Sequence, residues 1–192
     1  MERTLVVFKP DSVARGLIGE ILSRFEKTGL KIIGAKMLQV SREMAEKHYP
    51  ADRKELWEGI GNKTLTHYKE VGADAKKLFG SDDAHEIGKI VRAWLLDYIT
   101  SGPVLAVVLE APHAVELVRK LCGNTLALKA EPGTIRGDYS YDSAFLANNA
   151  KRALKNMIHA SGSLEEAKYE IPLWFKPSEL YSYSRCDEQA MK

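Results

Sequence analysis

The residues best suited to chemistry in this sequence surround a histidine in the stretch 156–163. Residues 157–158 are expected to end a short buried strand, and Ser163 with Glu166 forms a capping box that predicts the start of a helix. His159 is then expected between strand and helix, near a helix N-terminus, where anions such as phosphate are favoured. The pattern indicates a site for phosphate chemistry, although a loop histidine bonded to a backbone carbonyl is the more frequent situation.

Further residues that suit phosphate binding lie at predicted strand ends, on one helix and in one long loop. Lysine offers a point charge and arginine a planar fork for phosphate oxygens, while threonine and asparagine add neutral hydrogen bonds. The residues are Lys9 after the first strand, Arg119 on the helix after the third strand, Thr125 and Arg136 in the loop 124–138, and Asn156 beside the last strand. Each could instead be an ordinary surface, helix or turn residue, but together they are complementary to a nucleoside polyphosphate.

The elements that must position these residues follow from hydrophobic periodicity. Runs rich in apolar and β-branched residues predict strands, and apolar residues at helical spacing predict amphipathic helices. The predicted strands are 4–8, 31–40, 104–109 and 157–158, and the predicted helices are 17–27, 41–49, 81–98, 114–121 and 142–154. Residues 50–80 are polar and helix-prone and are interpreted as a helical excursion. We expect Ser41 and Ser81 to cap the helices that follow them, and the loop 124–138 to lack regular structure.

Without the excursion, the order of elements is strand, helix, strand, strand, helix, strand. This βαββαβ order predicts an α+β, ferredoxin-like fold, an antiparallel sheet with helices on one face, here with helical insertions. A chain of 192 residues with 45% hydrophobic content can bury one sizeable core, so we expect residues 1–192 to form a single domain. A fold of this kind does not by itself identify a function.

Composition argues against several classes of protein. The formal net charge of +2 comes from acids and bases spread along the chain, so no polybasic arm and no specific nucleic-acid partner are expected. Cys122 and Cys186 are far apart and lack zinc-ligand spacing, which argues against a disulfide framework or a zinc site. No apolar run approaches the ~20 residues that span a membrane. These features predict a soluble, cytoplasmic protein with no membrane partner.

Several separated blocks of the sequence resemble the nucleoside diphosphate kinase family. The block Asn156-Met157-Ile158-His159-Ala160-Ser161, with Glu170 and Leu173-Trp174-Phe175 after it, looks like the active-site motif of that family. The other blocks are Glu2-Arg3-Thr4 through Lys9-Pro10-Asp11, Arg15-Gly16-Leu17-Ile18-Gly19-Glu20-Ile21, His48-Tyr49, Ser101-Gly102-Pro103-Val104 and Pro132-Gly133-Thr134-Ile135-Arg136-Gly137-Asp138. A match on this many blocks in one order is far more specific than the histidine motif alone.

The resemblance implies transfer of the γ-phosphate of a nucleoside triphosphate, usually ATP, to a nucleoside diphosphate by a ping-pong mechanism through a phosphohistidine. By family likeness, Nδ1 of His159 attacks the γ-phosphorus, while Glu170 holds the other ring nitrogen with support from Ser161. The implied nucleotide contacts are Lys9, Tyr49 and Arg136 to the transferring phosphoryl group, Arg119 and Thr125 to the inner phosphates, and Lys9 and Asn156 to the sugar hydroxyl. Lys9 therefore counts among both the catalytic and the nucleotide-binding residues.

Cofactor and partners are implied in the same way. The resemblance implies Mg²⁺, held mainly by nucleotide phosphates and water rather than by protein ligands, and a homo-oligomer, either a hexamer or a tetramer. The expected substrates are ATP and other nucleoside tri- and diphosphates. The alternative is a non-catalytic nucleotide-binding or interaction module of the same fold; loss of His159, Lys9 or Arg136 would have favoured it, but all three are present. A third interpretation, an RNA-binding sheet, lacks the aromatic and glycine-rich run expected on its strands.

Two segments depart from the family pattern and are interpreted as insertions, at about 50–86 and about 140–153. Counting back along the sequence without gaps places Val91 where family members stack the base on an aromatic ring, so Val91 is the predicted base contact. Trp94 is the alternative, because stacking needs a flat ring. After the second segment, Leu154 replaces a glycine of the family pattern.

Overall fold

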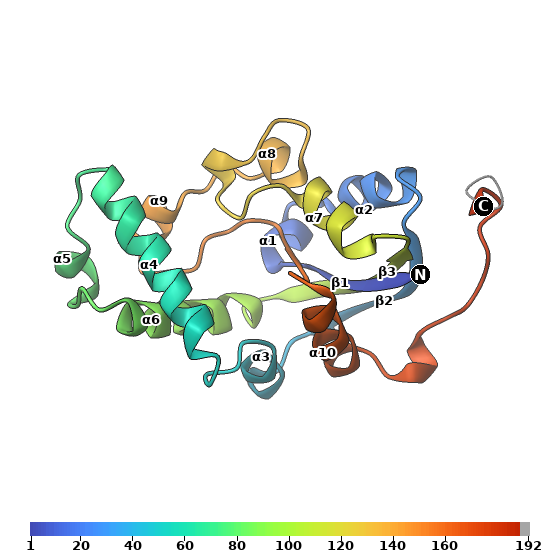
Figure 1. Ribbon diagram of the computed structural model, residues 1–192, viewed down its shortest axis with the longest axis horizontal. Helices are drawn as coiled ribbons and strands as arrows, with labels where there is room; N and C mark the ends of the chain where they lie inside the picture. The colour runs from blue at the N-terminus through green and yellow to red at the C-terminus, as the bar shows by residue number, and fades with distance from the viewer. Residues whose placement is uncertain (189–192) are drawn as a thin grey trace. The chain divides into compact units, whose positions relative to one another are not determined.

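The computed structural model describes residues 1–188 and divides into two compact units (Figure 1). The first unit consists of residues 1–39, 103–140 and the chain from 156 onward, and the second of residues 40–102 and 141–155. Each unit has its own cluster of buried apolar side chains. The expectation that residues 1–192 form a single domain stays a prediction, and its last four positions lie outside the described residues.

The first unit contains a four-stranded sheet with the order β2-β3-β1-β4. Its strands are β1 (Glu2–Phe8), β2 (Lys31–Gln39), β3 (Pro103–Ala111) and β4 (Ile158–Ala160). All three pairs of neighbouring strands are antiparallel. The predicted ferredoxin-like α+β fold is therefore confirmed, with β4 as a short edge strand that pairs with β1.

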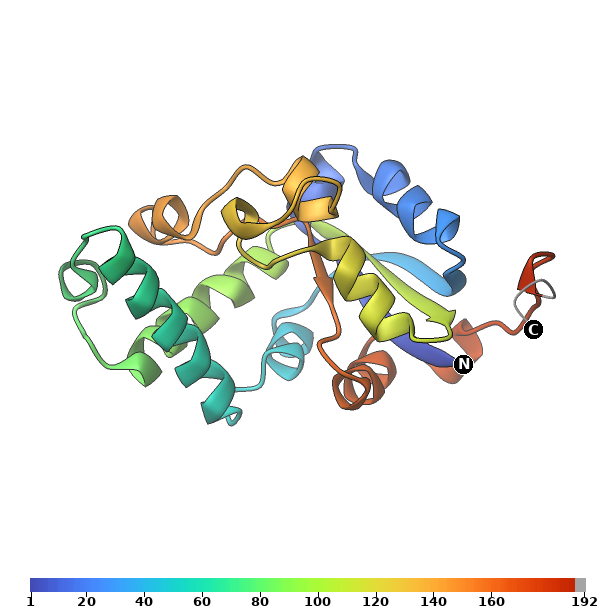
Figure 2. The ribbon, with the colours of Figure 1, turned by 45° about the horizontal axis from the view of Figure 1, so that its top comes forward.

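Two helices that connect the strands cover one face of this sheet. They are α2 (Ile18–Lys27) and α7 (Ala114–Cys122), and both were predicted to within one residue at each end. Because side chains alternate along a strand, Val6 and Phe8 of β1 point to this face and join Phe25 of α2 in the buried core. Figures 1 and 2 both show the two helices on the same side of the sheet.

A third helix, α10 (Leu164–Trp174), packs against β1 from the other side of the sheet (Figures 1 and 2). Leu5 and Val7 point to this second face, and both are fully buried. The predicted capping residue begins this helix, since the hydroxyl of Ser163 accepts a hydrogen bond from the N–H of Glu166 at 3.2 Å. The helix start is thus fixed by local sequence.

The position of the last strand corrects the sequence analysis. Residues 157–158 were expected to end the strand, but β4 begins at Ile158 and continues through His159, which pairs with Val7 of β1. Met157 instead has a left-handed backbone with φ of 71°. His159 therefore lies within the edge strand and not in the gap after it, so the strand ladder fixes its backbone.

Shorter helical segments complete the first unit. They are α1 (Pro10–Ala14), η1 (Ala127–Lys129), α8 (Ile135–Tyr139) and η2 (Pro177–Glu179), where η marks a 3-10 turn. The prediction that 124–138 lacks regular structure was wrong in part, because this loop contains η1 and most of α8. Thr134 caps α8 by accepting a hydrogen bond from the N–H of Gly137 at 3.1 Å, a local signal that the sequence carried.

The C-terminal segment 175–188 runs along β2, the strand at the opposite edge of the sheet from β4. The N–H of Tyr181 donates to the carbonyl of Ile33 at 2.7 Å, and the hydroxyl of Tyr183 donates to the carbonyl of Ile32 at 2.8 Å. The register of β2 on β3 shifts between residues 32 and 34, so Ile33 lies in a bulge. The segment therefore covers part of an edge whose backbone groups would otherwise be open to pairing.

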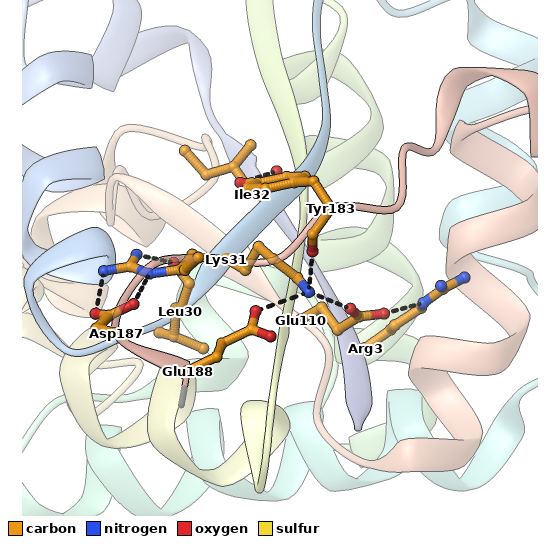
Figure 3. Close-up of polar contacts among 9 residues, drawn as sticks. Arg3, Leu30, Lys31, Ile32, Glu110, Tyr183, Asp187 and Glu188 are labelled. Atoms are coloured by element: carbon orange, nitrogen blue, oxygen red, sulfur yellow. Dashed lines mark hydrogen bonds and ion pairs between the residues drawn. The ribbon is translucent and has the colours of Figure 1, made fainter. Parts of the chain in front are cut away.

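A buried lysine ties this segment to the sheet (Figure 3). The ammonium group of Lys31 donates to the carbonyl of Tyr183 at 2.8 Å and lies 3.0 Å from Glu188 and 3.1 Å from Glu110. Glu110 also pairs with Arg3 at 2.8 Å. The hydrogen bond that Lys31 donates to the carboxylate of Glu188 raises the pKa of Lys31, so the lysine stays charged inside this cluster.

The second unit is helical. Its helices are α3 (Arg42–His48), α4 (Lys54–Glu70), α5 (Ala75–Phe79), α6 (Ala84–Ile99) and α9 (Ala144–Asn149). Glycines let α4 and α6 approach closely: a Cβ on Gly61 would lie 1.8 Å from the carbonyl oxygen of Ala84, and one on Gly88 would lie 2.1 Å from that of Trp57. The helical excursion predicted over 50–80 thus consists of α4 and α5.

Capping residues of the second unit were predicted with mixed success. Ser41 caps α3 by accepting a hydrogen bond from the N–H of Met44 at 3.1 Å, as expected. The prediction for Ser81 was wrong, because Asp83 caps α6 and accepts from the N–H of Glu86 at 2.8 Å. Aspartate and serine are equally good caps, so the helical pattern did not distinguish Ser81 from the aspartate two residues further on.

The helix predicted over 142–154 is also corrected, since only Ala144–Asn149 is helical. The chain after this short helix is held by a side chain instead. The carboxylate of Asp142 accepts hydrogen bonds from the guanidinium of Arg152 at 2.5 Å and from the N–H of Lys155 at 2.9 Å. Residues 152–155 are therefore held by the side chain of Asp142 and not by a continuing helix.

No helix within residues 1–188 is both long enough and apolar enough to cross a membrane. Both cysteines are free thiols: Cys122 is buried and Cys186 is exposed.

Candidate active site

One cavity in the first unit collects six of the predicted site residues. Its lining consists of Lys9, Arg119, Cys122, Gly123, Thr125, Arg136, Asn156, Ile158, His159 and Ala160. The cavity volume is about 140 Å³, below the ~300–1,000 Å³ of pockets that enclose a whole small ligand. Three lining side chains are cationic, and among the described residues of this lining there is no carboxylate. The cavity therefore suits the phosphate end of a larger ligand.

The histidine of the cavity is oriented by a carboxylate from α10. Nε2 of His159 lies 2.8 Å from Oε1 of Glu170, whose side chain is buried. The hydroxyl of Ser161 donates to Oε2 of the same carboxylate at 2.6 Å and accepts from the N–H of Leu5 at 3.2 Å. A proton on Nε2 directed at this carboxylate leaves the lone pair on Nδ1, the nitrogen that the sequence analysis expected to react.

A lysine and an asparagine are coupled on the cavity wall. Nζ of Lys9 donates to the side-chain oxygen of Asn156 at 2.6 Å, and the side-chain amide of Asn156 donates to the carbonyl of Thr125 at 2.9 Å. Burial, and secondly the charge of Arg136, lowers the pKa of Lys9 from 10.5 to about 7. An anion in the cavity would favour the charged ammonium.

The two arginines of the cavity have different environments. Arg136 is 8% exposed, and its guanidinium donates to the carbonyls of Gly123 at 2.8 Å, Asn156 at 3.2 Å and Ile158 at 2.8 Å. Burial lowers the pKa of Arg136 below its ordinary value. Arg119 is exposed on α7. Arg136 is therefore a fixed part of the wall, whereas Arg119 reaches the cavity from the surface.

Four lining residues were not predicted from the sequence: Cys122, Gly123, Ile158 and Ala160. Gly123 has φ of 75°, and a Cβ there would lie 2.4 Å from Oγ1 of Thr134, so the close approach of these two segments requires glycine. Gly123 directly follows the last residue of α7. Burial raises the pKa of Cys122 to about 11, which keeps its thiol protonated at neutral pH. Nothing in the sequence marked this cysteine as part of the site.

Two predicted site residues, Tyr49 and Val91, belong to the second unit. The ring centroids of Tyr49 and Trp57 lie 6.5 Å apart. The backbone carbonyl of Tyr49 accepts a hydrogen bond from Nε of Arg92 at 2.7 Å. Val91 on α6 packs against the apolar cluster of this unit, as does Trp94. Contacts of Tyr49 with phosphate and of Val91 with the base stay predictions.

Comparison with known families shows to which family the chain belongs. The family model described as nucleoside diphosphate kinase matches residues 2–60 and 73–180. The chain belongs to the nucleoside diphosphate kinase family. The matched ranges contain every predicted site residue, and the gap 61–72 lies inside the first predicted insertion. The family predicted from the sequence, and with it the assignment as a phosphotransferase, is confirmed.

Similar nucleoside diphosphate kinases extend over nearly the whole chain. The protein of that name from Pyrobaculum aerophilum is 49% identical over 180 residues, covering 94% of this chain and 98% of the relative. A crystal structure of an NDP kinase from the same organism has a TM-score of 0.90 at 48% identity, covering 94% of this chain and 99% of that one. Because so little is left unaligned, most of the two segments interpreted as insertions has a counterpart there.

A second solved structure bears on the chemistry. It is a transition state mimic of nucleoside-diphosphate kinase from Borrelia burgdorferi with bound vanadate and ADP. Its TM-score is 0.78 at 39% identity, and the alignment covers 98% of this chain and 95% of that one.

Proposed function

We propose that this nucleoside diphosphate kinase transfers the γ-phosphate of a nucleoside triphosphate, usually ATP, to a nucleoside diphosphate through a phosphohistidine on His159. The observation that carries the proposal is the position of this histidine: it lines a cationic cavity while Nε2 meets the buried Glu170 at 2.8 Å. Family membership and the vanadate and ADP complex of the Borrelia burgdorferi relative support the same chemistry.

In the first half-reaction, Nδ1 of His159 attacks the γ-phosphorus, and the bond from that phosphorus to the β,γ-bridging oxygen breaks. The nucleoside diphosphate leaves, and the imidazole carries the phosphoryl group with a positive charge shared around its ring. Glu170 stabilises this charge through Nε2, and Ser161 holds the carboxylate in place. A second nucleoside diphosphate then attacks the phosphohistidine with a β-phosphate oxygen and takes the group by the reverse path.

The cationic side chains of the cavity bind phosphate. Lys9 and Arg136 contact the transferring group, and Arg119 with Thr125 contacts the inner phosphates. Asn156 is held by Lys9 and the carbonyl of Thr125, so its amide is set for the sugar hydroxyl. Since these contacts address parts that all nucleotides share, we expect a broad range of nucleotide substrates.

We propose Mg²⁺ as the divalent cation. The described lining of the cavity has no carboxylate to act as a hard-cation ligand, so its donor set fits a metal that arrives on the nucleotide, held by phosphate oxygens and water. When bound, the ion would neutralise phosphate charge and orient the phosphoryl group for in-line transfer.

Assembly and location complete the proposal. By family likeness we expect a homo-oligomer, hexamer or tetramer, and light scattering of the purified chain distinguishes these from a monomer. The two free thiols, one of them exposed, are in keeping with a reducing, cytoplasmic environment.

The test is direct. Incubation with γ-labelled ATP and Mg²⁺ should give an acid-labile phosphoenzyme that GDP discharges as GTP, and a His159→Ala variant should not label. A His113→Asn variant is the matched control, because it removes an exposed histidine whose φ of 55° asparagine tolerates. Equal labelling of His159→Ala and wild type would refute the assignment. A wild-type chain that binds ATP without labelling would indicate the non-catalytic nucleotide-binding module instead.

A further inference from the structure

A strained turn immediately precedes the strand that carries the proposed nucleophile. Met157 has φ of 71°, and the N–H of Ile158 donates to the carbonyl of Asn156 at 2.8 Å. A hydrogen bond between residues two apart with positive φ at the central residue is the rare type of γ-turn. A bulky residue such as methionine adopts this conformation at an energetic cost, and such strain persists only where surrounding groups impose it.

The surrounding groups come from the first turn of α1. The N–H of Met157 donates to the carboxylate of Asp11 at 3.1 Å. The carbonyl of Met157 accepts from the hydroxyl of Ser12 at 2.5 Å and from the N–H of Lys9 at 2.9 Å. Both backbone polar groups of the strained residue are therefore held by residues 9–12.

The turn controls three side chains of the cavity. Asn156, at its start, reaches Lys9, and His159, two residues beyond its centre, reaches Glu170. The carbonyls on either side of the centre, those of Asn156 and Ile158, both bind the guanidinium of Arg136. A change of backbone conformation at the turn would displace all three at once.

We propose that Asp11 and Ser12 are positioning residues for phosphoryl transfer, acting through the γ-turn at Met157. This inference rests on the proposed function. Asp11 and Ser12 do not line the cavity, and Ser12 is completely buried. Their contribution is to hold a peptide unit in a conformation that the chain would not keep by itself, so that nucleophile and phosphate-binding groups face one another.

The test compares Ser12→Ala in three backgrounds: wild type, Met157→Ala and Met157→Gly. Glycine adopts positive φ freely and alanine does not, while the two differ by a single methyl group. Displacement of reacting groups is costly, so Ser12→Ala should slow phosphoenzyme formation at saturating ATP about 10-fold in wild type and in Met157→Ala. In Met157→Gly the turn does not need side chains to hold its backbone, so the loss of rate caused by Ser12→Ala should shrink to about 2-fold.

Asp11→Ala is measured in the same three backgrounds. The Asp11 charge also favours the protonated form of Lys9, but that effect is the same whatever residue occupies position 157. Only a loss that shrinks in Met157→Gly therefore reports on the turn. An equal loss in the alanine and glycine backgrounds would show that both residues act on general stability and would overturn the inference.

If a Met157 variant fails to fold, hydrogen exchange decides. Asp11→Ala should lose protection of the Met157 amide while the amides of β1 and β3 keep theirs, and unchanged protection at Met157 would equally overturn the inference. Failure of the wild-type chain to form a phosphoenzyme would refute the proposed function, and this inference with it. Normal wild-type labelling with background-independent losses refutes the inference alone.

Discussion

Nε2 of His159 and Oε1 of Glu170 lie 2.8 Å apart, joining the edge strand β4 to the helix α10. This contact fixes the ring so that its other nitrogen is the one able to react. In the proposed mechanism it also places a negative charge beside an imidazole that becomes cationic when it is phosphorylated.

Replacement of the Glu170 carboxylate by an amide should slow phosphoryl transfer while the side chain still fills the same space. Glu170→Gln keeps the size of the side chain but removes the charge that stabilises a phosphorylated imidazole, so phosphoenzyme formation should slow by about 100-fold. Rapid-quench measurement with labelled ATP gives the rate. Glu165→Gln, on the exposed face of the same helix, is the control and should behave as wild type. A Glu170→Gln rate within 3-fold of wild type, roughly 0.7 kcal/mol, would contradict the role.

Nucleotide binding should take up a proton at Lys9. Its pKa of about 7 in the free protein means that much of the lysine is neutral between pH 7 and 10, and bound phosphate should restore the charge. Calorimetric titration with ATP at pH 8 in buffers of different ionisation enthalpy should reveal this uptake. Lys9→Met should lose it, and uptake that persists in that variant would assign the proton elsewhere.

The same lysine predicts how stability depends on pH. The pKa of Lys9 is lower in the folded protein than the ordinary 10.5, so the unfolded chain binds more protons between about pH 7 and 10.5. Stability of the nucleotide-free protein should therefore rise with pH across this window because of Lys9. Denaturant unfolding of wild type and Lys9→Met at pH 7 and 9.5 tests the point: the stability gained by wild type should exceed that gained by the variant.

Substitutions of the two cavity arginines should affect different properties: protein stability for Arg136 and ATP binding for Arg119. Arg136→Lys leaves buried carbonyls without donors and should lower the free energy of unfolding by about 2–4 kcal/mol. Arg119→Lys, on the exposed side of the same cavity, should weaken ATP binding with a change of under ~0.5 kcal/mol in stability. Urea unfolding together with ATP titration checks both, and equal destabilisation by the two variants would contradict the contrast.

The C-terminal segment should depend on a glycine in β2. A Cβ on Gly34 would lie 2.8 Å from Cδ2 of Leu180 and 2.9 Å from the carbonyl oxygen of Glu179. Gly34→Ala should push the segment away and lower the free energy of unfolding by about 1–3 kcal/mol. Gly19→Ala, in α2 with open space around it, should instead stabilise by about 0.5–1 kcal/mol. Thermal unfolding of the pair checks the sign of each change.

Much of the site could be predicted because its residues are marked by local sequence. Ser163 caps α10 as its spacing with Glu166 predicts, and the separated blocks identify the family. Lys9, Arg119, Thr125, Arg136, Asn156 and His159 were singled out from the sequence, and all line one cavity. Boundaries were less secure: a short edge strand such as β4 has too few residues for periodicity to fix its ends, so His159 was placed after it.

The sequence by itself determined the order of strands and helices, the residue types able to handle phosphate, and the family, because each depends on local patterns along the chain. Only the tertiary structure decided that Arg136 is fixed by three carbonyls and that Asp11 and Ser12 hold the backbone of Met157. These contacts join residues up to 146 positions apart, and in each of them one partner is a backbone group of a kind that other residues also carry. A backbone group can form such a hydrogen bond whatever the side chain of its residue is. The sequence pattern therefore could not predict which residues these hydrogen bonds would join.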